Sequence, residues 1–471
     1  MPRLLQRRAV AAGLLMAAAG CADFLNSDKA TKDPNLPTTA ARDNLFIGVQ
    51  ANIFAEQEGP LAMIVCRFMQ QCSGVNGRFV QTEDNYLGVN PATSWLDPAF
   101  REPYSAGGLI ALRAVESSAD AAGDKVYLGI AQVLEALLIG TTADVWGNIP
   151  YSEAVTNTTT PKFDDQMQVY AGLQTLLDQA IANIGGAGAG PSLADDLFFG
   201  RTVGGDENTD ANRKAQWIQV AYTLKARYHM HTAERLGAAA YTAARAAALQ
   251  GVSSDANTLR TTHTSATSER NMWRQFQVTS GFGLDLVAGK RLVDLMVADN
   301  DPRLPEYFGR NSQGGFGGND VTTGNTPGEV ISPIAGSGRD IDNFRQPVVT
   351  WEENQLILAE ASYQLAGGGA AGVIAAQPYL DAVRTFHGKA TKPATLQAMM
   401  EEKYISLFQN IEVWSDWRRT CLPALQPALG RPAIPGRLPY GQTEEQTNPN
   451  TPPSSAQNLF TVRNPNDPNG C

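Results

Sequence analysis

The stretch that decides the fold runs from Asp124 to Ala154 and reads DKVYLGIAQVLEALLIGTTADVWGNIPYSEA. Within it, apolar side chains recur every three or four residues, which is the period of one face of an α-helix. These residues are Ile130, Val133, Leu134, Leu137 and Leu138. Because so apolar a face must be buried against other helices, the stretch predicts a central helix of a helical core.

The end of this helix is a tight polar turn between two aromatic residues. Gly147 and Pro150 stop the helix, because glycine adopts a positive φ without cost and proline cannot continue the hydrogen-bonded ladder. Trp146 and Tyr151 bracket the turn. We interpret the motif as a helix end held in place by aromatic packing, and hence as a structural corner.

Composition limits the possible classes of function. The 471 residues are 43% hydrophobic and 18% charged, which suits a large core in one or two interlocked domains. The net charge is -10, from 37 basic and 47 acidic residues, and the chain shows no basic patch. This argues against nucleic acid and polybasic membrane attachment. The negative charge also disfavours strongly acidic polymers as ligands.

The N-terminus carries an export signal. Three arginines precede an apolar run from Ala9 to Ala19, and small residues stand directly before Cys21. This pattern resembles the bacterial lipobox, although Ala18 stands where leucine is commoner, which leaves ordinary signal cleavage open. We expect residues 1–20 to be removed, Cys21 to be lipidated and residues 21–41 to form the anchor and tether. No later stretch approaches the roughly 18 uninterrupted apolar residues of a membrane span.

The remaining cysteines are Cys66, Cys72, Cys421 and Cys471. In an oxidising compartment they can pair in three ways, and the sequence alone does not choose among them. Proximity along the chain favours Cys66 with Cys72, which leaves Cys421 with Cys471. Metal binding is less favoured, because no C-x-x-C pair is present.

Helical periodicity continues along most of the chain, and few segments alternate with the period of two that is typical of strands. We therefore predict a mainly helical (all-α) fold of degenerate tetratricopeptide-like helix pairs, with long irregular loops and little β-structure. Further helices are expected at residues 61–69, 164–184, 212–236, 239–249, 352–365, 379–386 and 401–423. Loops at about 73–103 and 309–345 and an extended tail at 426–471 lack helical periodicity.

Five separated motifs resemble those of the SusD/RagB-like outer-membrane lipoproteins, in the order expected for that family. They are the stretch with Asp144, Trp146, Gly147, Pro150 and Tyr151; the Asp301-Pro302-Arg303 turn; the helix at 351–361; the Trp417-Arg418-Arg419-Thr420 ending; and Arg437-Leu438-Pro439-Tyr440. In the last motif, Gly441 stands where the family usually has proline. Because such motifs are shared regardless of ligand, we assign their residues to packing and capping, with Asp301 placed to cap the segment after it.

The resemblance implies a single SusD-like helical domain over residues 42–471, held by its lipid on the outer membrane and facing the cell exterior. Such proteins are not enzymes. They capture glycans or other oligomeric nutrients and lie as a lid over a partner TonB-dependent (SusC-like) transporter that imports them. No cofactor or metal is expected.

Ligand contacts are expected in the variable loops, because sugars bind aromatic rings through their apolar faces and polar side chains through their edges. In the first long loop the candidates are Asn76, Arg78, Phe79, Tyr86 and Trp95. The second group comprises Asn271, Trp273 and Arg274. Tryptophan is mostly buried in proteins, so burial of Trp95 and Trp273 stays an open alternative.

Two other functions remain open from the sequence. One is an exported hydrolase that acts on oligosaccharides, although the chain has neither G-x-S-x-G nor H-E-x-x-H and only four histidines. The other is a helical scaffold lipoprotein without a small ligand. His229 and His231 are two residues apart on one expected helix and so point to different faces, and we interpret His231 as a core histidine and not as a metal ligand.

Overall fold

The computed structural model describes residues 40–75, 86, 97–105, 107–202, 205–279, 285–324, 326–452 and 460–471. Its first helices are α3 (Arg42–Glu58), α4 (Pro60–Phe68), α6 (Asp97–Arg101), α7 (Leu109–Ala121), α8 (Lys125–Trp146), α9 (Gln166–Ile184), α10 (Asp210–His231), α11 (Ala233–Leu236) and α12 (Ala238–Ala248). The later helices are α13 (Met272–Val278), α14 (Lys290–Ala298), α15 (Leu304–Tyr307), α16 (Trp351–Leu365), α17 (Gly369–Phe386), α18 (Leu396–Ser406), α19 (Glu412–Thr420) and α20 (Gln442–Thr447). Short 3-10 turns are η4 (Glu102–Tyr104), η5 (Asp255–Asn257) and η6 (Gly328–Val330).

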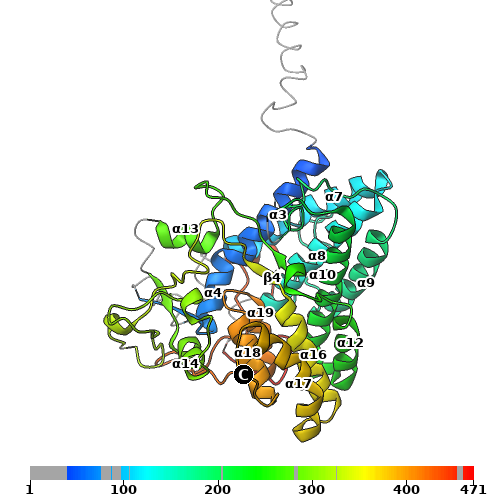
Figure 1. Ribbon diagram of the computed structural model, residues 1–471. Coiled ribbons are helices and arrows are strands. Elements are labelled where there is room, and N and C mark those ends of the chain that lie inside the picture. Colours follow the sequence, from blue (N-terminus) through cyan, green and yellow to red (C-terminus); the bar gives the residue numbers. More distant parts are fainter. Residues whose placement is uncertain are drawn as a thin grey trace, which may run out of the picture.

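Helix pairs form one side of the molecule. Neighbouring helices pack side by side in the order α7, α8, α9, α10, α12, α16 and α17, and Figure 1 shows them stacked on the right. We call this side the helical half. It confirms the predicted fold of tetratricopeptide-like helix pairs.

Helix α8 is the core of this half. Every residue from Val126 to Trp146 is buried. The helix begins where the side chain of Asp124 accepts the N–H of Tyr127, and it ends at Gly147, whose φ is 80°. A Cβ atom at position 147 would lie 2.5 Å from Asn464 Oδ1, so glycine is needed here for space as well as for conformation. Although α8 is long and apolar enough to cross a membrane, its apolar window is entirely buried, as in the core of a globular protein.

The other side is irregular. Two small antiparallel sheets form in the protein, from the strands β1 (Cys72–Gly74) with β3 (Leu286–Ala288) and β2 (Leu259–Arg260) with β4 (Pro347–Val349), and the second sheet contacts α10. In the first sheet Cys72 pairs with Ala288 and Gly74 with Leu286. The sheet β1–β3, the helices α13 and α14 and the segment 309–345 make up what we call the irregular half, on the left of Figure 1.

Three predicted ranges differ from the structure, and the first of them, 212–236, is divided at Thr232 into α10 and α11. Helix α17 begins at Gly369, ten residues before the predicted start at Tyr379, and it contains Pro378 in its interior. The alanine-rich stretch before Pro378 carries little amphipathic signal, and a proline normally argues for a helix boundary. The predicted helix at 401–423 is two helices, α18 and α19. Between them Gln409 has a φ of 65°, which a continuous right-handed helix excludes.

The tail crosses the end of α8. The indole N–H of Trp146 donates to the carbonyl of Pro439 at 2.9 Å, and the amide of Asn464 donates to the carbonyl of Asp144 at 3.2 Å. A disulfide joins Cys421 to Cys471, and a second joins Cys66 to Cys72. The pairing favoured by proximity is therefore confirmed, and an otherwise irregular tail is held on the helical half.

Candidate ligand-binding region

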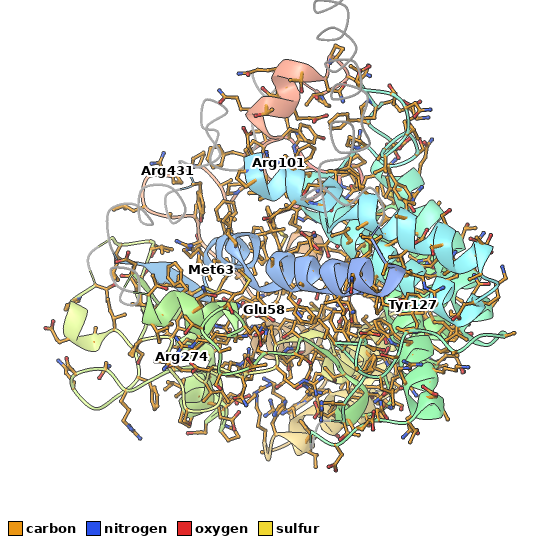
Figure 2. The ribbon with its side chains drawn as sticks, turned by 90° about the horizontal axis from the view of Figure 1, so that it is seen from above. Glu58, Met63, Arg101, Tyr127, Arg274 and Arg431 are labelled. Carbon is orange, nitrogen blue, oxygen red and sulfur yellow. A yellow bond between two sulfur atoms is a disulfide. The ribbon has the colours of Figure 1, made fainter. Side chains whose placement is uncertain are left out.

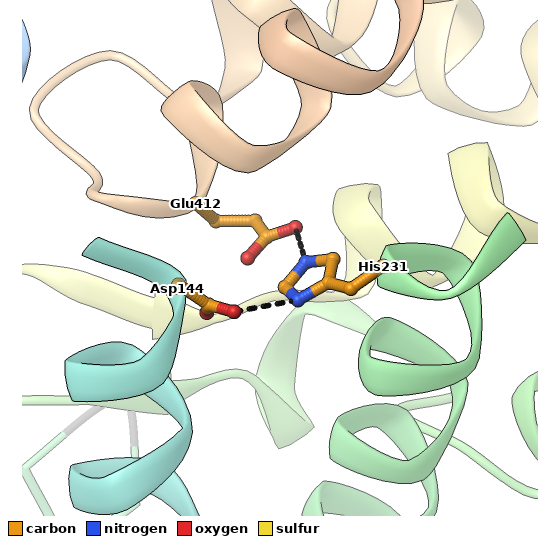
Figure 3. A group of neighbouring side chains, drawn as sticks. All are labelled: Asp144, His231 and Glu412. Carbon is orange, nitrogen blue, oxygen red and sulfur yellow. Dashed lines mark hydrogen bonds and ion pairs between the residues drawn. The ribbon is translucent and has the colours of Figure 1, made fainter. Parts of the chain in front are cut away.

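Three side chains from distant parts of the chain meet where α8, α10 and α19 converge. The imidazole of His231 lies between two carboxylates, with Nδ1 2.8 Å from Asp144 Oδ1 and Nε2 2.7 Å from Glu412 Oε1 (Figure 3). All three side chains are buried. Each ring nitrogen faces its own carboxylate, which suits a protonated imidazolium held between two acids better than three ligands around one ion.

The electrostatics of this cluster favour the charged histidine. Burial alone would lower the pKa of His231, but the carboxylates of Asp144 and Glu412 outweigh it and raise that pKa to about 10. His231 is therefore charged at neutral pH and neutralises two buried acids. It is a core residue, as predicted, and its contacts hold three helices together.

Other buried charges on this side are also paired. Arg227 donates to both carboxylate oxygens of Glu353 at 2.6 Å, and Lys403 lies 2.7 Å from Asp416. Arg419 binds Glu360 and, at 3.0 Å, Asp416. A buried charge is tolerated when it is paired and hydrogen-bonded, so these groups are engaged within the fold and are not available to a ligand.

The motif residues at the end of α8 lie in the same interior. Trp146 is fully buried, and the hydroxyl of Tyr151 donates to Glu135 at 2.8 Å. Arg418 donates to the carbonyl of Asp144 at 2.6 Å, which neutralises a carbonyl in the last turn of α8. Pro150 and Trp417 are buried beside them.

The Asp301-Pro302-Arg303 turn forms a second buried cluster. Asp301 accepts the backbone N–H of Arg303 at 3.0 Å and pairs with the guanidinium of Arg303 and with Lys389. The same two cations bind Glu402. Helix α15 begins one residue after Arg303, which occupies its N-cap, so Asp301 caps the turn ahead of the helix and not the helix itself.

Only one of the five candidates of the first long loop lies among the described residues. Asn76, Arg78, Phe79 and Trp95 lie outside the described residues. Tyr86 is described and is only 2% exposed, with its ring edge-on to Phe68 at 5.2 Å. A ring so enclosed has no free face for a sugar, so a ligand contact of Tyr86 stays a prediction that its burial does not support.

The second group is part of the packing between α13 and α3. Asn271 caps α13 and donates to Glu58 at 2.9 Å, and Trp273 is 4% exposed. Arg274 forms ion pairs with Asp340 and Asp342. Figure 2 shows Arg274 beside the Glu58 end of α3, with Tyr127 at the other end. Of the two alternatives for Trp273, the buried ring is the correct one, because the ring packs under the short helix α13.

A polar cavity of about 210 Å³ opens beside the sheet β1–β3, at the end where β1 begins. It lies between the start of α14, the segment around residue 320 and the tail. The close approach of these backbones requires glycine, since a Cβ at Gly318 would lie 2.4 Å from backbone atoms of Gly289 and Lys290. The polar lining residues are Gln70, Lys290, Arg291, Asp294, Asn319, Asp320, Thr322 and Gln426.

The comparison with known families decides the relationship. The model of a SusD-like family, described as starch-binding and associating with the outer membrane, matches residues 34–441. The chain belongs to this SusD-like family. No curated protein matches it.

Solved structures share the fold of this SusD-like protein. One, named a chitin-binding protein, has 21% identity and a TM-score of 0.69, covering 87% of this chain and 94% of that one. A SusD/RagB family protein from Bacteroides thetaiotaomicron has 20% identity and a TM-score of 0.67, covering 90% and 98%. A chitin-binding SusD homolog from Flavobacterium johnsoniae has 17% identity and a TM-score of 0.66, covering 90% and 97%.

Sequence reasoning did not select the cavity of this SusD-like protein. Arg291 stands ten residues before the Asp301-Pro302-Arg303 turn, and Gln70 directly follows the predicted helix at 61–69. Neither residue type nor spacing distinguished them from ordinary surface residues. One usable signal was the position of Gln70 just before the loop at 73–103, since residues that flank a variable loop often share its site.

Proposed function

We propose that this protein captures glycans at the cell surface and delivers them to a partner TonB-dependent outer-membrane transporter, without catalysing a reaction on them. Lipidation of Cys21 anchors it to the outer membrane, with the folded domain facing outward. Ligand binds on the irregular half, at the cavity beside the sheet β1–β3 and on the loop that follows β1.

The observation that carries this proposal is the family match over residues 34–441, since that family is described as starch-binding and associated with the outer membrane. Two of the similar structures are named chitin-binding, which supports a glycan as the ligand class. The buried charges around His231 are paired with one another, which supports a role in holding the fold, whereas Arg291 in the cavity has no such partner among the described residues.

Affinity capture tests the partner and the anchor together. The tagged lipoprotein is captured from gently solubilised outer membranes beside a Cys21→Ala control, and the co-purifying proteins are identified by mass. We expect a large β-barrel transporter in near-stoichiometric amount with the wild type, and loss of membrane retention in the control. Recovery of the lipoprotein alone would overturn delivery to a transporter.

Binding and turnover are tested on the purified protein with starch and chitin oligosaccharides. We expect retention on at least one glycan and unchanged oligosaccharides after long incubation. Hydrolysis products would restore the exported-hydrolase alternative. A folded protein that binds no glycan and is dispensable for uptake would favour the scaffold alternative.

A further inference from the structure

Within the described chain, the guanidinium of Arg291 makes no hydrogen bond and no ion pair, and its Nε is buried without a partner. Arg291 is the second residue of α14, partly exposed, and it lines the cavity beside the sheet β1–β3. Other arginines with buried guanidinium atoms, such as Arg227 and Arg419, bind carboxylates. Leaving such a group unsatisfied has a free-energy penalty that a bound anion would remove.

The other charged groups of the cavity are already engaged. The ammonium of Lys290 forms an ion pair with Asp294 one turn along α14. Asp320 accepts the backbone N–H of Thr322 at 3.0 Å and its hydroxyl at 2.6 Å. Two cations and two acids thus line the cavity. Within the described part of this lining, the guanidinium of Arg291 is the cation that has no acid as a partner.

The remaining lining can bind sugar hydroxyls. Gln70, Asn319 and Gln426 contribute amide or carbonyl groups, and Thr322 contributes a hydroxyl. Gln70 has a φ of 55°, a left-handed conformation that is uncommon outside glycine and that tends to occur at functional sites. The amide of Gln70 donates to the carbonyl of Gln426, so the segment after α4 and the tail are joined at the rim of the cavity.

From this arrangement, which rests on the proposed function, we propose that the cavity selects glycans that carry an anionic group, a carboxylate or a sulfate ester, and that Arg291 binds that group. The planar fork of a guanidinium matches either anion with two parallel hydrogen bonds. The net charge of -10 disfavours acidic polymers at long range, but salt screens charges beyond about 8–10 Å. A local, partly buried guanidinium therefore decides the preference.

The test uses matched pairs of oligosaccharides that differ only in the anionic group. Oligogalacturonate is compared with its methyl ester, and a sulfated carrageenan oligosaccharide with its desulfated form, beside neutral starch and chitin oligosaccharides. Affinities of the full-length lipoprotein in detergent are measured for the wild type and for Arg291→Gln. We expect one acidic member to bind at least about tenfold more tightly than its neutral counterpart, and Arg291→Gln to remove this difference.

Two further variants separate the guanidinium from general charge. Arg235→Gln makes the same charge change on the exposed surface of α11 and is expected to leave the preference intact. Arg291→Lys keeps the charge but not the fork, and is expected to retain only part of the preference. Unfolding curves verify that each variant is folded.

The outcomes separate the two proposals. Equal affinity for acidic and neutral members, or a preference that survives Arg291→Gln, overturns the anion site while glycan capture stands. Absence of binding to every oligosaccharide overturns glycan capture and the anion site with it. The pair that shows the preference identifies the anion as carboxylate or sulfate.

Discussion

The packed interior around His231 and the cavity beside the sheet β1–β3 differ in whether every cation has a partner. In the interior, His231 is held by two carboxylates, and Arg227, Lys403 and Arg419 each bind an acid. In the cavity beside β1 and β3, Arg291 has no such partner among the described residues. The difference indicates where a ligand would bind. A paired charge already has its interaction within the fold, whereas an unpaired cation can still bind an anionic group of a ligand.

Removing the central cation of the helical half should have the largest effect. The substitution His231→Phe leaves Asp144 and Glu412 buried without their shared partner, and we expect the free energy of unfolding to fall by about 3–5 kcal/mol. Denaturant unfolding followed by circular dichroism measures it. The matched control is His229→Ala on the same helix, which forms no such pair and should lose about 1 kcal/mol. Equal losses in the two variants would show that pairing of His231 with the two carboxylates does not contribute to the free energy of unfolding.

The disulfide that holds the tail should stabilise the protein more than the disulfide at the start of β1. Cys421 and Cys471 close a loop of 50 residues, whereas Cys66 and Cys72 close one of 6. Chain entropy predicts about 4 kcal/mol for the long loop and about 2 kcal/mol for the short one. Paired alanine variants, compared by denaturant unfolding, are expected to show the greater loss for Cys421 and Cys471. A reversed order would mean that the tail is held by its other contacts.

Alkaline pH should weaken the helical half. The pKa of His231 is raised to about 10, above the ordinary value of about 6.5 in the unfolded chain. The folded state therefore keeps a proton that the unfolded state releases, and stability is complete below pH 6.5 and declines as pH rises toward 10. One such group gives at most about 1.4 kcal/mol per pH unit. Unfolding curves at several pH values test this, and His229→Ala should preserve the slope. Constant stability across this range would rule out the charged histidine.

The smallest effect is expected at Arg291. Because this guanidinium forms no pair among the described residues, Arg291→Gln should change the free energy of unfolding by less than about 0.5 kcal/mol. The same substitution at Arg419 leaves Glu360 without its main partner and should cost about 3 kcal/mol. Parallel denaturant curves compare the two. A large loss of unfolding free energy in Arg291→Gln would show that this guanidinium has a stabilising partner, and the contrast with Arg419 would disappear.

Helical spacing was sufficient to predict the helical half. The apolar stripe of α8 and the stop at Gly147 are local signals, and the structure bears them out. Local signals failed where conformation depends on tertiary contacts, as at Gln409, whose positive φ divides α18 from α19. His231 could be identified as a core residue, but its two acids lie 87 and 181 residues away in sequence, at positions 144 and 412, and no spacing relates them.

The candidate site was harder to predict for the same reason. Residue type left open whether the ring of Trp273 is exposed or buried, and only the structure shows that it packs under α13. Arg291 looked like an ordinary helix residue, because whether a guanidinium has a partner depends on segments far along the chain. Its cavity is assembled from residues near 70, 290, 320 and 425, and proximity among these appears only in three dimensions.

The contacts of the tail with α8 have a consequence for how the protein is made. The carbonyl of Asp144 receives Arg418 and Asn464, which follow it by 274 and 320 residues. Contacts between such distant residues form late, because the intervening chain must first be synthesised and its ends brought together. The end of the central helix therefore stays incomplete during most of synthesis. A chain cut short before residue 418 would therefore leave the carbonyl of Asp144 without either of these two donors.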